Sequence, residues 1–270
     1  MPVQKTVRLD IAYDGSRFHG FQKLPGKRTI QGELERCLSI IYKEEVKTFG
    51  AGRTDAGVHA IHQVISYKTK MLLPPENIKR AMNTLLPEDI RIYEASYQDS
   101  QFHARFSPIQ RTYVYVIYNA PVCPPFLAHF VWHKKNKIDV RRLKKTLKHL
   151  KGSHDFTSFC QADENKTKTR EIFDIQIKKK KPFLFITIRG NAFLRRMIRI
   201  IVGTAFGITE KPLFHPDEMK SILLKKKRGE NPFLTAPPTG LYFYKVDFKD
   251  SKKKKFSRKI FFDFLTGKWE

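Results

Sequence analysis

Residues 112–118 constrain the fold more than any other segment of the chain. Read as a strand, they place aliphatic and aromatic side chains on both faces: Tyr113, Tyr115 and Ile117 on one, and Val114, Val116 and Tyr118 on the other. A strand that is apolar on both faces must be covered on both sides. We therefore expect residues 112–118 to form a central strand of a sheet.

The first hundred residues alternate between strand and helix patterns. Strands are indicated at 6–13, 46–49, 62–69 and 90–96, and amphipathic helices at 29–41 and 74–86. This alternation with few strands predicts an α+β fold of ferredoxin-like type, with helices on one face of a sheet.

A second unit is expected to begin near Phe106. Asp139 is a good N-cap for a helix over 140–150, and a lysine-rich tip at 178–182 joins strands at 172–177 and 183–189. A helix over 193–206 would place Arg195 and Arg199 on one face, and 241–248 forms a last strand. We therefore expect subdomains at 1–105 and 106–248, followed by a basic tail at 249–270.

The charge of the chain points to a polyanionic partner. Its 52 Lys and Arg against 26 Asp and Glu give a formal charge of +26, which favours nucleic acid. No apolar run is long enough to span a membrane, and the N-terminus has no signal or transit pattern, so we expect a cytoplasmic protein. The three cysteines, Cys37, Cys123 and Cys160, lie far apart, which argues against a disulfide framework or a zinc site.

Residues 50–60, Gly-Ala-Gly-Arg-Thr-Asp-Ala-Gly-Val-His-Ala, form the most site-like stretch. Glycines flank Arg53 and Asp55, whose charges need partners if they are buried, and they would let an RNA backbone come close. The residues alone leave two interpretations open. The loop is either a functional site or a surface turn in which Asp55 bonds its own backbone and Arg53 pairs with it.

Two other polar loops favour structural interpretations. The cluster Phe18-His19-Gly20-Phe21-Gln22 reads as a small core under a loop, with substrate contact as the alternative. His154 and Asp155 are adjacent in sequence, so their side chains point apart if the chain is extended there. A cap or loop hydrogen bond is therefore favoured over a catalytic pair.

The chain lacks the sequence motifs of several common kinds of enzyme chemistry. It has no P-loop, no dinucleotide glycine fingerprint, no nucleophile elbow and no metal-ligand spacing. What remains is an aspartate that works without metal or cofactor, as a covalent nucleophile or as a general base. In either role it needs a cationic partner that lowers its pKa, and Arg53 and Arg199 are candidates.

Residues 50–60 closely resemble the catalytic signature of the tRNA pseudouridine synthase A family. Further blocks with the same resemblance occur in order along nearly the whole chain: residues 13–15, 19–22, 29–35, 102–107, 111–115, 154–159, 193–199 and 236–241. Several ordered blocks make the resemblance specific. It implies the pseudouridine synthase fold, in which the sheets of two ferredoxin-like subdomains join around a central cleft.

The resemblance also implies a reaction and its residues. Uridine at positions 38, 39 and 40 of the tRNA anticodon stem-loop would be isomerised to pseudouridine by a homodimer, without cofactor or metal. Asp55 would be the essential carboxylate and Arg199 its charge partner. Tyr113 would stack on the target base and assist proton transfer, and Arg53 would stand in for the flipped base or guide it. The competing hypothesis is a catalytically silent RNA-binding or RNA-folding protein, which the charge alone supports equally well.

Overall fold

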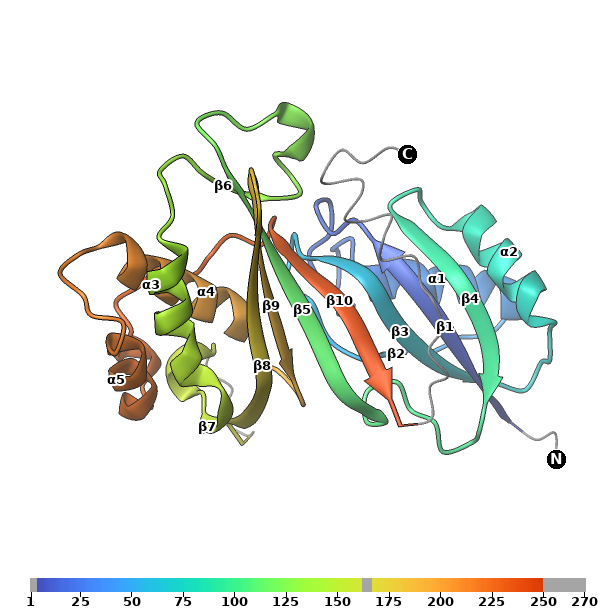
Figure 1. Ribbon diagram of the computed structural model, residues 1–270. Coiled ribbons are helices and arrows are strands. Elements are labelled where there is room, and N and C mark those ends of the chain that lie inside the picture. Colours follow the sequence, from blue (N-terminus) through green and yellow to red (C-terminus); the bar gives the residue numbers. More distant parts are fainter. Residues whose placement is uncertain (1–3, 162–166, 250–270) are drawn as a thin grey trace. The chain divides into compact units, whose positions relative to one another are not determined.

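A computed structural model describes residues 4–161 and 167–249 (Figure 1). They form two compact units. The first combines the residues up to Ile109 with those from Tyr242 onward, and the second runs from Gln110 to Leu241. Residues 250–270 of the expected basic tail lie outside the described residues.

The first unit is built on a mixed sheet. Its elements are β1 (Lys5–Tyr13), α1 (Ile30–Tyr42), β2 (Phe49–Gly50), β3 (His59–Thr69), α2 (Pro75–Leu85), β4 (Ile90–Gln98) and β10 (Leu241–Phe248). Strand β1 lies between β3 and β4 and is antiparallel to both. Strand β2 pairs with β3 in the antiparallel sense, while β10 pairs with β3 in the parallel sense through Tyr242 and Phe243.

Local sequence explains these elements. Val7, Leu9 and Ile11 alternate along β1 and are buried, which is the pattern of a strand with one face against a core. Helix α1 begins where the Thr29 hydroxyl accepts a hydrogen bond from the Gly32 N–H, and it buries Leu34 and Leu38. Helices α1 and α2 pack against each other, and α2 packs on β4 (Figure 1).

The second unit contains both antiparallel and parallel strand pairs. Its elements are β5 (Pro108–Asn119), β6 (Trp132–Lys134), α3 (Val140–Leu147), β7 (Gly152–Asp155), β8 (Thr169–Lys180), β9 (Phe183–Gly190), α4 (Met197–Glu210) and α5 (Glu218–Lys225). Strands β5, β9, β8 and β7 are neighbours in that order, and each adjacent pair is antiparallel. The short β6 runs parallel to β5.

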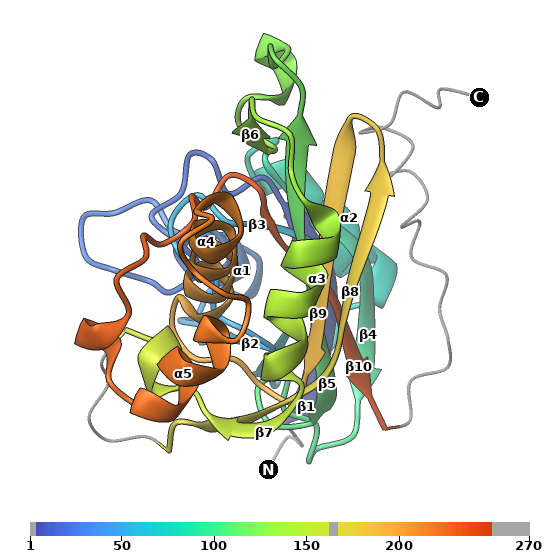
Figure 2. The ribbon, with the colours of Figure 1, turned by 60° about the vertical axis from the view of Figure 1, so that its left-hand side comes forward.

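Strand β5 has the burial that its sequence predicts. Val114, Tyr115, Val116 and Ile117 are each at most 1% exposed, so both of its faces are covered. The helix expected after Asp139 is also present, because the Asp139 carboxylate accepts a hydrogen bond from the Arg142 N–H and caps α3. Helices α3, α4 and α5 pack together in this unit (Figure 2).

One helix prediction is wrong at its start. Helix α4 begins at Met197, and Arg196 before it has a φ of 60°, in the left-handed region that a right-handed helix does not use. Residues 193–196 therefore precede the helix. Arg195 is outside the helix and does not share a helical face with Arg199.

The units also divide the chain at points that differ from the expected boundaries. The first unit extends to Ile109 rather than 105, and it includes the last strand from Tyr242, which we expected in the second subdomain. The reason is long-range pairing: Tyr242 and Phe243 pair with His59 and Ala60 of β3. A pairing across so many residues leaves no periodic signal in the sequence.

Candidate active site

The loop that carries Arg53 and Asp55 joins β2 to β3 in the first unit. It starts from Gly50, which pairs with Ile65, and Ala51 continues the attachment through an N–H that donates to the Val64 carbonyl. Asp55 is half-buried and Arg53 is exposed. The side chain of Asp55 is therefore partly accessible to solvent, on a loop whose start is attached to the sheet.

Residues 18–21 support the backbone of this loop. The Phe21 N–H donates to the Thr54 carbonyl at 3.0 Å, and the Gly57 N–H donates to the Phe18 carbonyl at 3.3 Å. Gly20 has a φ of +98°, and a Cβ there would lie 2.9 Å from the Thr54 carbonyl oxygen and 3.2 Å from the Asp55 carbonyl carbon. Glycine at position 20 thus allows both the positive φ and the close approach to the Asp55 backbone.

Two buried polar side chains hold the same loop from β1 and β3. The Tyr13 and Thr54 hydroxyls are 2.8 Å apart, and the Gln63 amide donates to the Gly52 carbonyl at 2.7 Å. Burial raises the pKa of Tyr13 to about 12, although hydrogen bonds to Thr54 and Gln63 act in the opposite direction. Tyr13 is therefore a neutral hydrogen-bonding group at physiological pH.

Gly50 and Gly52 face aromatic rings of the protein itself. A Cβ at Gly50 would lie 2.5 Å from the Phe21 ring, and one at Gly52 would lie 2.6 Å from the Phe243 ring. Both distances are too short for a real contact. These two glycines make room for core packing, so the expectation that they let an RNA backbone come close is wrong for them.

His59 ends the loop and was not singled out by the sequence analysis. It is 2% exposed, its Nδ1 lies 3.0 Å from the Asp14 carboxylate, and its ring stacks on Tyr242. Burial alone would raise the pKa of Asp14, but hydrogen bonds from His59 and Ser16 lower it well below the usual range. The available signal was its position, four residues after Asp55 in the quoted motif.

Arg199 lies near the start of α4 in the second unit. Its Nε donates to the Ala236 carbonyl at 2.9 Å, and its own carbonyl accepts from the Ala236 N–H at 3.0 Å. The helix can approach this segment because Gly203 has no side chain: a Cβ there would lie 2.0 Å from the Leu234 carbonyl oxygen. Residues 234–236 therefore fix the orientation of the Arg199 guanidinium.

Tyr113 lies on β5 and is 7% exposed. Its ring meets Phe193 edge-on, with centroids 5.2 Å apart. Tyr115, two residues along and so on the same face of the strand, has a pKa that burial raises and the positive charge of Arg199 lowers. Arg199 is thus close to the face of β5 that carries Tyr113.

The two polar loops have the structural roles that the sequence favoured. Phe18 and Phe21 are each 3% exposed and form a small core beneath the Asp55 loop. The Asp155 carboxylate accepts hydrogen bonds from the Thr157 N–H at 2.9 Å and the Thr157 hydroxyl at 2.6 Å. His154 instead contacts the Lys151 carbonyl at 2.9 Å.

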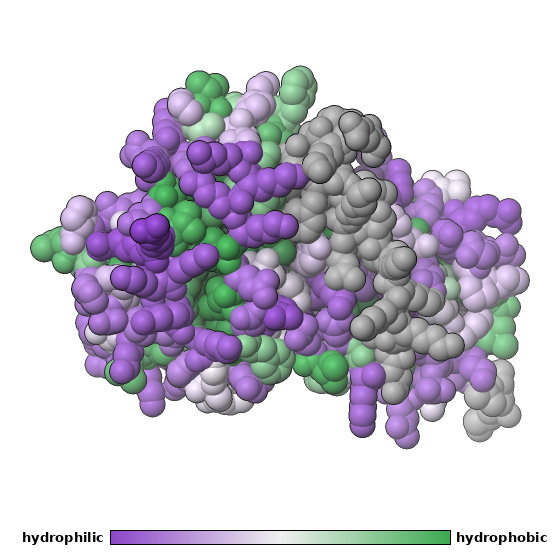
Figure 3. Space-filling view, viewed as in Figure 1, coloured by the Kyte–Doolittle hydropathy of each residue, from purple (hydrophilic) through white to green (hydrophobic). Residues whose placement is uncertain are grey.

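The described residues contain no group of three or more His, Cys, Asp or Glu side chains arranged to hold a metal ion. A helix that could cross a membrane is likewise absent from residues 4–161 and 167–249. Hydrophilic side chains predominate on the face drawn in Figure 3, in keeping with the strongly basic composition.

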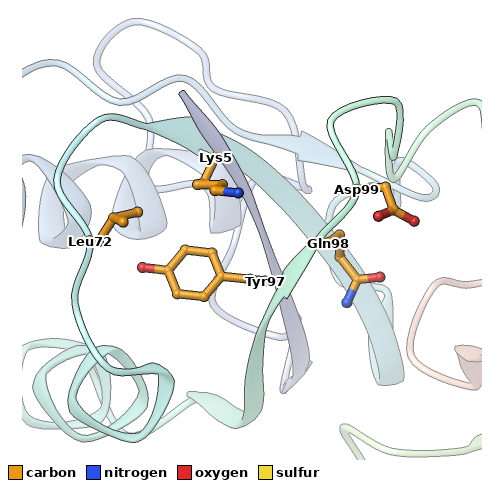
Figure 4. A pocket seen from close by; sticks show the side chains of 5 residues that line it. All are labelled: Lys5, Leu72, Tyr97, Gln98 and Asp99. Carbon is orange, nitrogen blue, oxygen red and sulfur yellow. The ribbon is translucent and has the colours of Figure 1, made fainter. Parts of the chain in front are cut away.

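A pocket of about 420 Å³ in the first unit is lined by Lys5, Leu72, Tyr97, Gln98 and Asp99 (Figure 4). None of the expected site residues lines it. The Tyr97 hydroxyl accepts from the Leu73 N–H and lies 3.0 Å from the Leu73 carbonyl, so it holds the segment after β3.

An acid on a loop held by backbone hydrogen bonds, an arginine held by a backbone carbonyl and a high positive charge fit an enzyme whose substrate is a polyanion. The family model described as tRNA pseudouridine synthase matches residues 11–107 and 146–249. The chain belongs to this family. It is an isomerase that converts uridine to pseudouridine in tRNA.

Individual relatives match over nearly their whole length. The chain is 42% identical over 243 residues to the tRNA pseudouridine synthase A of Bacillus velezensis, covering 89% of this chain and 98% of that protein. It is 39% identical over 247 residues to that of Brachyspira hyodysenteriae, covering 90% and 98%. Likeness to solved structures is distant: a Cbf5-Nop10-Gar1 complex matches with a TM-score of 0.36 and 11% identity, over 89% of this chain and 59% of that one.

Proposed function

We propose that this enzyme modifies uridines 38, 39 and 40 in the anticodon stem-loop of tRNA, with Asp55 as the essential carboxylate. In the reaction the bond from C1′ to N1 breaks, a bond from C1′ to C5 forms, C5 loses its proton and N1 gains one. The observation that carries the proposal is the support of the Asp55 backbone by residues 18–21. A fixed backbone keeps the carboxylate in position for either of its two possible roles, adding to the sugar or abstracting a proton.

Arg199 is proposed to pair with Asp55 in the assembled site. A guanidinium beside the carboxylate favours its ionised form, which either role requires. The contacts of Arg199 with Ala236 support this assignment, because they fix the plane of the guanidinium before substrate binds. A preorganised charge loses little free energy to reorientation during the reaction.

Tyr113 and Arg53 are proposed to handle the base. A uridine in a paired stem must leave the stack before it can react, which costs a few kcal/mol. The Tyr113 ring, held edge-on by Phe193, is suited to stack on the flipped base and to assist proton transfer. Arg53 is exposed on the same loop as Asp55, so its planar side chain could guide the base or replace it in the stem.

The fold supports the same assignment. In the first unit, the order β1, α1, β2, β3, α2, β4 and the neighbours β4, β1, β3 and β2 match a ferredoxin-like arrangement. We propose that two such subdomains join around the cleft of a pseudouridine synthase. We further propose that the enzyme is a cytoplasmic homodimer and needs no cofactor.

The formal charge of +26 supports binding to the tRNA backbone without regard to sequence. Such contacts suit an enzyme that acts on neighbouring uridines. A catalytically silent RNA-binding protein would share this charge but has no need of an acid held on a rigid loop. Membership of an isomerase family favours the enzyme over that alternative.

The deciding experiment measures tritium release from unmodified tRNA labelled at C5 of uridine. The wild-type protein should release tritium at positions 38, 39 and 40. Asp55→Asn, which keeps the size of the side chain and removes its charge, should release none while binding tRNA with similar affinity. If neither protein releases tritium although both bind tRNA, the isomerase assignment is wrong. Equal release by both would show that Asp55 is not essential.

A further inference from the structure

Three aromatic rings contact one another at the surface of the first unit. The ring centroids of Phe49 and His103 are 4.6 Å apart, and those of His103 and Phe106 are also 4.6 Å apart. Phe49 is 44% exposed and Phe106 is 72% exposed. We call these three side chains the aromatic platform. Exposed aromatic rings in contact are costly to leave in water, which marks them as a binding surface.

The platform is rigid because its turn is hydrogen-bonded throughout. The Phe106 and Ser107 N–H groups both donate to the His103 carbonyl, while the His103 N–H donates to the Ser107 hydroxyl. The Ala104 N–H donates to the hydroxyl of Ser66, the residue of β3 that pairs with Phe49. The sheet and the turn therefore hold the rings in place before any ligand arrives.

Positive charge lies beside these rings. The Arg105 guanidinium lies 5.2 Å from the centre of the Phe106 ring. Burial, Arg105 and Lys68 lower the pKa of His103, so its ring is neutral at physiological pH. The His103 Nδ1 accepts from the Arg105 N–H, which puts the proton of the neutral ring on Nε2. The platform thus offers apolar faces, a ring N–H donor and adjacent cations.

We propose that the aromatic platform binds an unpaired base of the tRNA substrate by stacking. Aromatic faces beside cations are the means by which proteins hold unpaired bases and the phosphates next to them. The net charge of +26 favours RNA over a second copy of this equally basic chain. The inference rests on the proposed function for its choice of ligand.

The platform is also close enough to Asp55 to serve the same RNA. Phe49 and Asp55 are six positions apart in the chain, so their Cα atoms are at most about 22 Å apart. That span corresponds to about six stacked nucleotides at roughly 3.4 Å each. The stacked base therefore lies on the order of six nucleotides or fewer from the uridine that reacts.

The first test compares tRNA affinity among variants made in the Asp55→Asn protein, so that binding is read without turnover. Phe106→Ala should weaken binding about 5- to 150-fold, the effect of losing one stacked base. Phe106→Leu, apolar but not aromatic, should lose a similar amount, whereas Phe106→Trp should keep the affinity. The matched control is Phe126→Ala, which removes a phenylalanine that is 86% exposed in the second unit and should leave binding unchanged.

The second test locates the base with anticodon stem-loop RNAs that each lack one base. Removal of the stacked base should weaken binding to the Phe106-containing protein and have no further effect on Phe106→Ala. Equal affinity of Phe106→Leu and its parent would overturn the proposal, as would a scan in which no position behaves this way. A change in sedimentation with unchanged RNA affinity would assign the platform to a second copy instead. Tritium release is measured separately, in the wild type and in a Phe106→Ala protein that keeps Asp55. No release by the wild type would refute the proposed function, whereas the affinities above decide only the role of the platform.

Discussion

Gly20→Ala tests whether the close support of the Asp55 backbone matters for catalysis. The new Cβ would lie 2.9 Å from the Thr54 carbonyl oxygen, where ordinary contact begins near 3.4 Å, so the loop must move by about 0.5 Å. A misplacement of about 1 Å in an active site can cost roughly 100-fold in rate, so 0.5 Å corresponds to about tenfold. We expect kcat to fall about tenfold, with tRNA affinity changed less than twofold.

Gly26→Ala is the matched control for this prediction. Gly26 also has a positive φ, of +64°, but a Cβ there would meet nothing within 4 Å. Both variants should lose stability by roughly 1–2 kcal/mol from the backbone conformation alone, which denaturant unfolding can measure. Only Gly20→Ala should lose turnover in the tritium-release assay under saturating tRNA. Equal kcat values for the two variants would refute the argument that contact with residue 20 positions Asp55.

Two further predictions concern charged groups. Arg199→Ala should lower kcat much more than tRNA affinity, because it removes the proposed charge partner of Asp55. Single-turnover kinetics measure the rate and filter binding measures the affinity. Equal losses in the two would mean that Arg199 contacts a phosphate instead. Burial alone would raise the pKa of Asp10, but hydrogen bonds and charges from His62 and Arg8 lower it below the ordinary value for an aspartate. The stabilisation from this lowered pKa is present at neutral pH and is lost as the pH falls below about 3.9 towards the folded-state pKa. The unfolding free energy of the wild type should therefore fall more steeply below pH 4 than that of Asp10→Asn, and parallel curves would contradict the assignment.

Much of the local structure follows from local sequence. Thr29 and Asp139 cap α1 and α3, as side chains that accept hydrogen bonds from the first turn should. Strand β5 is buried on both faces because its residues are apolar on both. In these cases the hydrogen bonds and the periodicity involve residues close together in the chain, and a pattern in the sequence is enough to predict them.

The sequence indicated the residues of the candidate site but not the contacts that position them. The ordered motifs indicated Asp55, Arg53, Tyr113 and Arg199, and their catalytic roles stay predictions until the proposed variants are tested. No local pattern showed that Arg199 would bond to Ala236, that Gly20 would press on the Asp55 backbone, or that Arg196 would adopt a left-handed conformation before α4. Each of these features depends on contacts between separate segments.

The loop at residues 50–60 shows which features the sequence determines and which features the tertiary structure decides. The sequence by itself determined that an acid and an arginine lie among glycines between two strands, in a chain charged enough to bind RNA. Only the tertiary structure decided what the glycines do: Gly50 and Gly52 admit the rings of Phe21 and Phe243, and Gly20 admits the loop backbone. The physical reason is that a glycine in sequence shows only a missing side chain, whereas the group that occupies the space comes from elsewhere in the chain.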